Sequence, residues 1–313
     1  MRCRNLRILF MGTPDIAASA LGALLDAGLS VVGAVTQPDK PRGRGHKLTP
    51  PEVKVLAEEN SIPVYQPEGL KNGELKPVLE ELKPDLIVVV AYGKILPEYV
   101  LEAPEKGCIN LHVSLLPKYR GAAPIQWAVL NGDEETGITT MRMDAGMDTG
   151  DILLQKRFAI GEYETSEELF DRMAEEGGKL LVETIHTLDS IVPVAQEHDK
   201  ATHAPMITKE MGKIDWNQPA KAVSKWICGM NSWPVAYTNY QGEVLKIYRA
   251  KICSEYGEDT PGKILCHTEK KGLKVACKTG SLYLQEVQFA GSKRMHPDDY
   301  LRGHSVEIGT VLE

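Results

Sequence analysis

Nearly continuous apolar segments alternate with stretches of helical periodicity along the first 113 residues. Five segments have the composition of strands buried in a sheet: residues 6–11, 31–36, 62–65, 85–91 and 109–113. Between them, three segments have apolar residues near helical spacing: residues 16–27, 51–59 and 75–82. Strand–helix–strand units form parallel sheets covered by helices on both faces. We therefore expect an α/β fold with a Rossmann-like, doubly wound, mostly parallel sheet.

The residues after 113 first complete this domain and then predict a second, smaller one. Residues 139–143 and 151–158 read as strands on either side of a loop, and residues 166–188 read as one long helix with glutamates in its first turn. After them come a short helical segment and five short strand-like segments: residues 220–228, then 236–240, 244–252, 262–267, 272–277 and 282–289. Short strands separated by turn residues are typical of a small β-barrel, here an OB-like one. We predict a catalytic domain over 1–189, a linker over 190–207 and the barrel over 208–313.

The composition excludes several classes of protein. The chain has 313 residues, of which 42% are hydrophobic and 25% charged, and no apolar run approaches the length of about 18 residues that crosses a bilayer. The apolar stretch near the start is too short for a secretory signal. Six cysteines without a C-x-x-C pair argue against a zinc site or a disulfide framework. We expect a cytoplasmic monomer without membrane contact.

Charge is distributed unevenly along the chain. From Thr208 onward there are 15 Lys and Arg against 12 Asp and Glu, whereas the preceding residues hold 21 basic and 31 acidic side chains. An acidic first part and a mildly basic second part are compatible with a second domain that faces a polyanion. An excess of three positive charges is also ordinary variation, so charge alone does not establish nucleic-acid binding.

Asn110 and His112 alternate with apolar residues at the end of a predicted strand. Side chains alternate between the faces of a strand, so the amide and the imidazole point the same way. Ligands of doubly wound sheets bind at the carboxyl ends of the strands, where the loops at 12–14, 92–93 and 114–117 also lie. An amide and an imidazole there could stabilise an oxyanion and transfer protons. Alternatively, they merely cap the strand.

Three aspartates interleaved with glycines follow in residues 143–153. Asp144, Asp148 and Asp151 lie on a segment that Gly146 and Gly150 allow to bend sharply. One of these carboxylates could support His112, as in catalytic triads. The spacing also resembles a calcium or magnesium loop, but the distal glutamate of such loops is missing, and we expect no metal.

Residues 37–51 form a basic insert between the second strand and its helix. Its cations are Lys40, Arg42, Arg44 and Lys47. Four prolines and two glycines predict that it forms neither helix nor strand. Long loops in compact domains are usually functional, and arginines on such a loop could contact phosphates and read a groove or an unpaired base. The alternative is a solvated surface loop.

Several motifs together resemble the formyltransferases that use 10-formyltetrahydrofolate. They are N-x-H-x-S-L-L-P at 110–117 with R-G at 120–121, D-x-G-x-D-x-G at 144–150, G-T-P-D-x-A at 12–17, AYGKILP at 91–97 and GAAPIQWA at 121–128. Val113 departs from the pattern, since the family more often has Gly or Ala at this position.

The resemblance implies an activity and assigns residues to it. It implies that Asn110, His112 and Asp148 are catalytic and that Ser114, Leu115, Leu116 and Pro117 contact the folate co-substrate. The insert and the carboxy-terminal domain further imply the member of the family whose formyl acceptor is methionyl initiator tRNA. In it, Lys40, Arg42, Arg44 and Lys47 contact the tRNA, and Arg44 reads the first, weakly paired position of its acceptor stem.

Other members of the family, and a relative without activity, are the alternatives. Glycinamide ribonucleotide formyltransferases usually lack the insert and the second domain. Formyltransferases that act on a sugar-nucleotide amine can have a similar second domain, so the insert is the main discriminator against them. A formyltetrahydrofolate hydrolase and a non-catalytic nucleic-acid-binding relative are the further alternatives.

Overall fold

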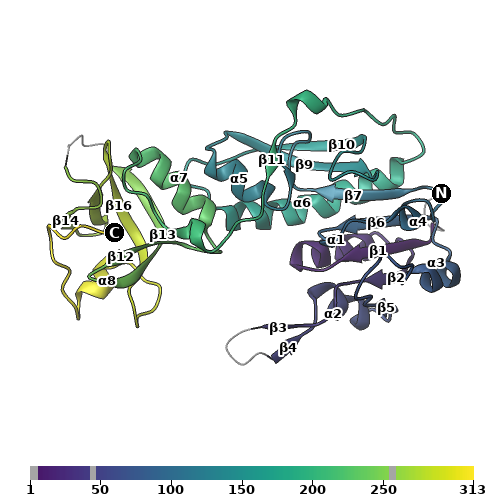
Figure 1. Ribbon diagram of the computed structural model, residues 1–313, viewed down its shortest axis with the longest axis horizontal. Helices are drawn as coiled ribbons and strands as arrows, with labels where there is room; N and C mark the ends of the chain where they lie inside the picture. The colour runs from purple at the N-terminus through teal and green to yellow at the C-terminus, as the bar shows by residue number, and fades with distance from the viewer. Residues whose placement is uncertain (1–5, 43–46, 254–258) are drawn as a thin grey trace. The chain divides into compact units, whose positions relative to one another are not determined.

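The computed structural model describes residues 6–42, 47–253 and 259–313, which form two compact units (Figure 1). The first unit contains the chain as far as Gly121, together with Gly137–Phe158 and Asp171–His203. The second contains Ala122–Thr136, Ala159–Phe170 and Ala204–Glu313. The chain therefore passes between the units several times before its final segment, rather than once.

A seven-stranded sheet forms the centre of the first unit, in the order β10-β9-β7-β6-β1-β2-β5. The strands are β1 (Ile8–Gly12), β2 (Val31–Val35), β5 (Val64–Tyr65), β6 (Leu86–Val90), β7 (Cys108–His112), β9 (Glu135–Arg142) and β10 (Ile152–Ala159). The five strands from β5 to β7 are parallel, and β9 runs antiparallel to β7. The predicted α/β fold with a mostly parallel sheet is confirmed.

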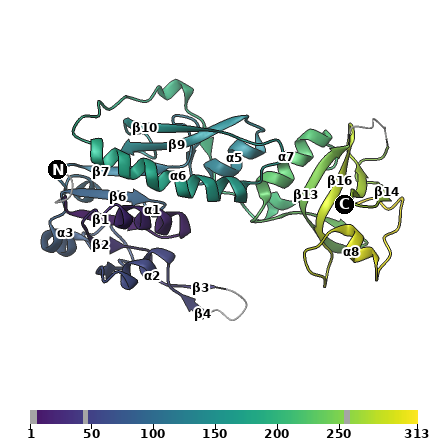
Figure 2. The same ribbon diagram turned by 180° about the vertical axis from the view of Figure 1, so that it is seen from behind.

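Helices cover both faces of this sheet. They are α1 (Asp15–Asp26), α2 (Glu52–Glu59), α3 (Lys76–Leu82), α4 (Glu98–Leu101) and α6 (Ser166–Thr187). Leu9, Ile87 and Cys108 belong to one apolar cluster with residues of α3 and α4. On the opposite face α1 and α6 lie side by side (Figure 2), and Ser19 of α1 donates a hydrogen bond to the Ala174 carbonyl of α6.

A five-stranded antiparallel sheet forms the main part of the second unit, in the order β12-β13-β16-β15-β14. These strands are β12 (Ala236–Tyr240), β13 (Glu243–Cys253), β14 (Ile264–Thr268), β15 (Gly272–Ala276) and β16 (Ser281–Gln288). The helices are α5 (Pro124–Leu130), α7 (Ala220–Met230) and α8 (Pro297–Leu301). The apolar side of the sheet packs against α7 in a core that includes Val223, Ile227 and Leu284. Closure of this sheet into a barrel stays a prediction.

The prediction that residues 37–51 form no strand is wrong. Strands β3 (Lys40–Arg42) and β4 (Lys47–Thr49) form an antiparallel ribbon in which Pro41 faces Leu48. A proline is tolerated in an edge strand, and both strands of a two-stranded ribbon are edges. Arg44 lies outside the described residues.

Short elements complete the fold. They are β8 (Arg120–Gly121), β11 (His203–Ala204) and 3-10 helices at His198–Lys200 and Glu210–Gly212. Among the described residues, no helix has both the length and the hydropathy that spanning a membrane requires.

Candidate functional site

The loops that follow β1, β2 and β6 meet at the carboxyl edge of the sheet in the first unit. The carbonyl of Tyr92, just after β6, accepts hydrogen bonds from Gln37 Nε2 at 2.9 Å and from Thr13 Oγ1 at 3.4 Å. Gly12 allows the turn after β1 to be tight, because a Cβ there would lie 2.8 Å from the Val90 carbonyl. The strand order reverses between β1 and β6, and such sheets bind ligands at the carboxyl ends of the strands beside this point.

Asn110 and His112 lie on β7, the strand between β6 and β9. Cys108 packs in the cluster with α3 and α4, and strand alternation places the side chains of Asn110 and His112 on that same face. Asn110 is only 9% exposed. Within the described part of the chain, its carboxamide makes no hydrogen bond. A nearly buried amide without a partner can receive a polar group of a ligand.

Nε2 of His112 lies 2.9 Å from the carbonyl oxygen of Tyr119. A carbonyl oxygen only accepts, so Nε2 carries the proton and donates it. The position of Tyr119 is in turn supported by its N–H, which donates to Thr202 Oγ1 at 2.8 Å. In the neutral ring, Nδ1 is therefore the nitrogen with the free lone pair.

Nδ1 of His112 faces Oδ2 of Asp148 at 3.7 Å, too far for a hydrogen bond but close enough for strong electrostatic attraction once the ring is protonated. The same Oδ2 accepts the Gly121 N–H at 2.8 Å. Of the three aspartates, the structure brings Asp148 to the histidine. Asp144 turns into its own loop, where Oδ1 accepts from the Gly146 N–H and from Thr149 Oγ1.

The segment Ser114–Pro117 is held from β9 and β10. Thr139 Oγ1 donates to the Ser114 carbonyl at 2.7 Å and accepts the Leu116 N–H at 3.2 Å. Gln155 Nε2 donates to the Leu116 carbonyl at 2.9 Å. The Ser114 hydroxyl donates to the Lys118 carbonyl at 2.6 Å, so it closes a turn within the loop. The sequence pattern of β9 and β10 did not single out Thr139 and Gln155 as supports.

Polar side chains connect the start of the basic insert to the rest of the first unit. Lys40 donates to Gln37 Oε1 at 2.6 Å, and Gln37 bonds the Tyr92 carbonyl at the sheet edge. Asp39 pairs with Lys54, and hydrogen bonds from Gln66 and Lys54 lower the pKa of the Asp39 carboxyl. These contacts fix the base of the ribbon. The side chains of Arg42 and Lys47 are not described, and the structure therefore leaves the predicted tRNA contacts untested.

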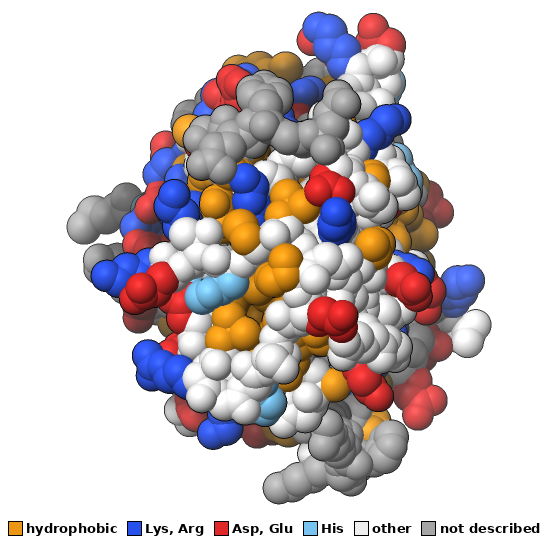
Figure 3. Space-filling view, turned by 90° about the vertical axis from the view of Figure 1, so that its left-hand side faces the viewer, with side chains coloured by type: hydrophobic (Ala, Val, Ile, Leu, Met, Phe, Trp, Pro, Cys, Tyr) orange, Lys and Arg blue, Asp and Glu red, His pale blue; other side chains and the backbone are white. Residues whose placement is uncertain are grey.

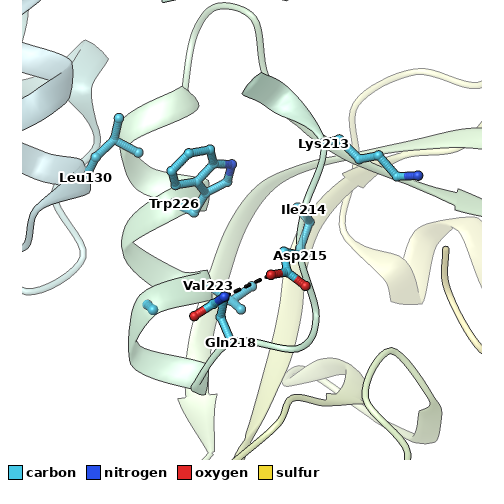
Figure 4. Close-up of a pocket in the computed structure, with 8 residues that line it drawn as sticks. Leu130, Lys213, Ile214, Asp215, Gln218, Val223 and Trp226 are labelled. Atoms are coloured by element: carbon cyan, nitrogen blue, oxygen red, sulfur yellow. Dashed lines mark hydrogen bonds between the residues drawn. The ribbon is translucent and has the colours of Figure 1, made fainter. Parts of the chain in front are cut away.

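A pocket of about 350 Å³ lies entirely in the second unit, beside α7 (Figure 4). Its wall is mainly apolar, with Leu130 and Trp226, and Gln218 donates to Asp215 at its border. It contains none of the predicted site residues.

One face of the molecule is seen in Figure 3, where basic and acidic side chains both occur around apolar ones.

The described residues contain no group of three or more His, Cys, Asp or Glu arranged to hold a metal ion.

Buried thiols belong to the packing of both units: burial raises the pKa of Cys108 and of Cys277 to about 12 each. A thiol with such a pKa stays protonated near neutral pH and is a poor nucleophile.

The chain belongs to the formyl transferase family. Residues 5–185 match the formyl transferase domain, and residues 206–305 match the formyl transferase C-terminal domain. The family uses formyltetrahydrofolate as formyl donor.

Relatives that share one name, methionyl-tRNA formyltransferase, match nearly the whole chain. Methionyl-tRNA formyltransferase of Desulforamulus reducens is 51% identical over 310 residues, which are 98% of each chain. The protein of that name from Caldanaerobacter subterraneus is 48% identical over 311 residues, covering 98% of this chain and all of the relative.

Solved structures share the fold at low sequence identity. Methionyl-tRNA formyltransferase from Clostridium thermocellum superposes with a TM-score of 0.55 at 20% identity, covering 79% of this chain and 94% of that one. HypX from Aquifex aeolicus in complex with tetrahydrofolic acid superposes with a TM-score of 0.64 at 16% identity, covering 97% of this chain and 50% of HypX.

Proposed function

We propose that this chain transfers the formyl group of 10-formyltetrahydrofolate to the free α-amino group of methionyl initiator tRNA, giving N-formylmethionyl-tRNA for translation initiation. The observation that carries the proposal is the strand end where Asn110, whose amide has no partner among the described residues, adjoins His112 and where Asp148 faces the imidazole. Relatives named methionyl-tRNA formyltransferase at about 50% identity over 98% of the chain support the choice of acceptor.

The residues at the sheet edge fit a folate co-substrate. The amide of Asn110 lacks a partner in the described chain and suits a formyl oxygen. Two large apolar side chains are exposed: Ile95, on the segment after β6, and Met147, directly before Asp148. Exposed apolar groups beside a polar centre are typical of ligand sites for flat ring systems. We assign Ser114–Pro117 to the same folate site, where the Ser114 hydroxyl is already engaged with the Lys118 carbonyl.

Bound formyl-folate supplies the carbonyl carbon that the amine attacks, and the bond from that carbon to N10 of the folate breaks. Asn110 donates from its amide to the formyl oxygen, where negative charge develops. His112 takes a proton from the attacking amine through Nδ1, because its Nε2–H is already committed to the Tyr119 carbonyl. Asp148 stabilises the imidazolium across the 3.7 Å separation. The ring then returns the proton to the leaving nitrogen, directly or through a water.

The basic ribbon is assigned to tRNA recognition. Lys40, Arg42 and Lys47 lie on a ribbon whose base is held by Gln37 and Asp39, and Arg44 stands between its two strands in the sequence. A two-stranded ribbon can enter a nucleic-acid groove, and arginine is the usual reader of base edges there. Arg44 is assigned to the first position of the acceptor stem.

The second domain is assigned to the tRNA backbone. Tyr283 on β16 pairs with Lys251 on the neighbouring strand β13 and with Lys274 on the other neighbour, β15. The ammonium groups of Lys271 and Lys274 lie 5.6 and 5.9 Å from the Tyr283 ring centre. Lysines grouped around an aromatic ring on a sheet suit contact with phosphates. In this proposal residues 1–189 hold the chemistry, 190–207 connect the domains and 208–313 bind tRNA.

In this proposal the chain acts as a monomer in the cytoplasm, the compartment where translation initiates. The test is direct: the purified protein is incubated with 10-formyltetrahydrofolate and charged initiator tRNA, and formylmethionine is measured after deacylation of the tRNA. A sugar-nucleotide amine serves as the competing acceptor. Formylation of the sugar but not of the tRNA would contradict the proposal.

A further inference from the structure

Gln196 is a buried polar residue in an otherwise exposed segment. It is 5% exposed, whereas residues 192–195 and 197–200 are all exposed. A buried amide in a native protein is normally hydrogen-bonded, and the identity of its partners shows what it holds.

The side-chain NH₂ of Gln196 donates two hydrogen bonds to one loop. They reach the carbonyl of Asp148 at 2.9 Å and the carbonyl of Gly150 at 2.7 Å. The orientation of the amide is determined by its partners, since carbonyls only accept and a guanidinium only donates. Oε1 of Gln196 accepts from Arg120 Nε at 3.1 Å and from Arg120 Nη2 at 2.7 Å.

The two hydrogen bonds from Gln196 hold Asp148 in a backbone conformation that residues other than glycine rarely adopt. Asp148 has φ +55°, in the left-handed region, and Asp carries a conformational cost there that surrounding contacts must offset. The glycine two residues later approaches its neighbour closely, because a Cβ on Gly150 would lie 1.7 Å from the Arg142 carbonyl. The loop is therefore fixed on one side by β9 and on the other by Gln196.

Arg120 and its neighbour support both the backbone and the carboxylate of Asp148. Its guanidinium holds Gln196, and the next residue in the chain, Gly121, donates its N–H to Asp148 Oδ2. Arg120 is anchored in turn, because its N–H donates to the Thr202 carbonyl at 2.9 Å. The backbone and the carboxylate of Asp148 are thus positioned from the same two-residue strand, β8.

We propose that Gln196 is a positioning residue for the formyl transfer, held by Arg120, and that it fixes the Asp148 carboxylate against His112. This inference rests on the proposed function, because it assigns Gln196 a role in that reaction. The side chain does not touch a reacting atom. A displacement of about 1 Å at a catalytic group can cost on the order of 10² in rate, so loss of both donated hydrogen bonds lowers turnover rather than binding.

A double-mutant cycle tests this role. Gln196→Met keeps the length of the side chain and removes its hydrogen bonds, and Asp148→Asn removes the charge that Gln196 positions. The two single variants, the double variant and the wild type are assayed with 10-formyltetrahydrofolate and charged initiator tRNA. Thr184→Val is the control, since Thr184 is also buried and hydrogen-bonded, to the Leu180 carbonyl on α6 and to Thr140 Oγ1 on β9, and neither partner belongs to the Asp148 loop.

Gln196→Met is expected to lower kcat about 10- to 100-fold, with KM for either substrate changed less than about twofold. In the Asp148→Asn background the same substitution should change kcat less than about twofold, because the two residues act through one carboxylate. The control should retain kcat. If Gln196→Met does not fold, as judged by circular dichroism, Gln196→Glu replaces it, since a carboxylate still accepts from Arg120 but cannot donate to the loop carbonyls.

Equal losses from Gln196→Met in both backgrounds, or no loss in the wild-type background, would overturn the inference and leave the proposed function intact. Absence of formylation by the wild type would overturn the proposed function and the inference with it.

Discussion

The hydrogen bond from His112 Nε2 to the Tyr119 carbonyl, 2.9 Å long, determines which nitrogen of the ring is free. In triads of the serine-protease type an aspartate performs this task, because it binds the ring N–H directly. Here a main-chain carbonyl does so, and the aspartate faces the other nitrogen. The tautomer of His112 is therefore independent of Asp148.

The first prediction follows from this division of tasks. Replacing the aspartate in a serine-protease triad by asparagine costs about 10⁴ in kcat, because the ring takes the wrong tautomer. Asp148→Asn should cost only about 10², the scale of a weakened general base, since Tyr119 still fixes the ring. Steady-state kinetics with saturating substrates measures kcat, and ¹⁵N NMR of the histidine reports the tautomer. A loss near 10⁴ with a changed tautomer would show that Asp148 orients the ring after all.

Asn110→Ala should lower kcat about 10²- to 10³-fold, the usual cost of losing one oxyanion donor. The affinity for tRNA should change little, because the side chain lies at the end of β7 and not on the basic ribbon. Single-turnover formylation gives the rate of the chemical step, and filter binding gives the affinity for tRNA. An unchanged rate would remove Asn110 from the proposed mechanism.

Periodicity predicted most of the fold because burial dictates it locally. The strands of the parallel sheet are mainly apolar, and their observed bounds differ from the predicted ones by only a few residues. Helices α4 and α8 were missed because four and five residues carry too little periodic signal. Helix α5 was also missed, although it has the same seven residues as the predicted α3. The ribbon of β3 and β4 was missed because prolines and glycines are read as loop residues, and nothing local marks a two-stranded pairing.

The candidate site was only partly accessible from the sequence. Strand alternation placed Asn110 and His112 together, but spacing alone left three aspartates equivalent. The family resemblance selected Asp148, and the structure places its carboxylate 3.7 Å from the ring. Gln196 had no signal, because its partners are 46 and 48 positions away and hydrogen bonds at that separation leave no local pattern. The segment predicted as a plain linker thus contributes to the site through one buried side chain.

Arg44→Ala should reduce the preference for initiator over elongator tRNA about 10- to 100-fold, corresponding to the 1–3 kcal/mol of one good base contact. Formylation rates of the two charged tRNAs are compared under kcat/KM conditions. Lys71→Ala, which removes an exposed cation outside the basic insert, is the control and should leave the preference unchanged. Normal discrimination by the Arg44 variant would show that the insert does not read the acceptor stem.

Gly150→Ala should impair both stability and turnover. The new methyl group would meet the Arg142 carbonyl at 1.7 Å, and a backbone atom cannot turn away as a side chain can. Overpacking of this kind costs about 1–3 kcal/mol of unfolding free energy, and the shifted loop carries Asp148. Urea unfolding and kcat are measured together. Gly22→Ala, where the nearest atom is 3.8 Å away in helix α1, should keep kcat and not lose stability. Equal behaviour of the two variants would contradict the close packing of the Asp148 loop.

Stability should fall at alkaline pH because buried groups retain protons in the folded chain. Burial raises the pKa of Cys108 and Cys277 to about 12 and that of Cys228 to about 11. The unfolded chain releases these protons near pH 8.5. The stabilisation is therefore complete below about pH 8.5 and is lost as the pH rises toward the folded values, by up to about 1.4 kcal/mol per pH unit for each thiol.

Urea unfolding at pH 7.5, 9 and 10 measures this loss. Cys108→Ala should reduce the pH-dependent part between pH 9 and 10 by about a third, because one of the three thiols no longer contributes. Burial also raises the pKa of Tyr92 to about 12, so a further decline should begin above about pH 10, where an unfolded tyrosine ionises. An unfolding free energy that stays constant from pH 7.5 to 10 would show that these thiols are not buried as protonated groups in the folded protein.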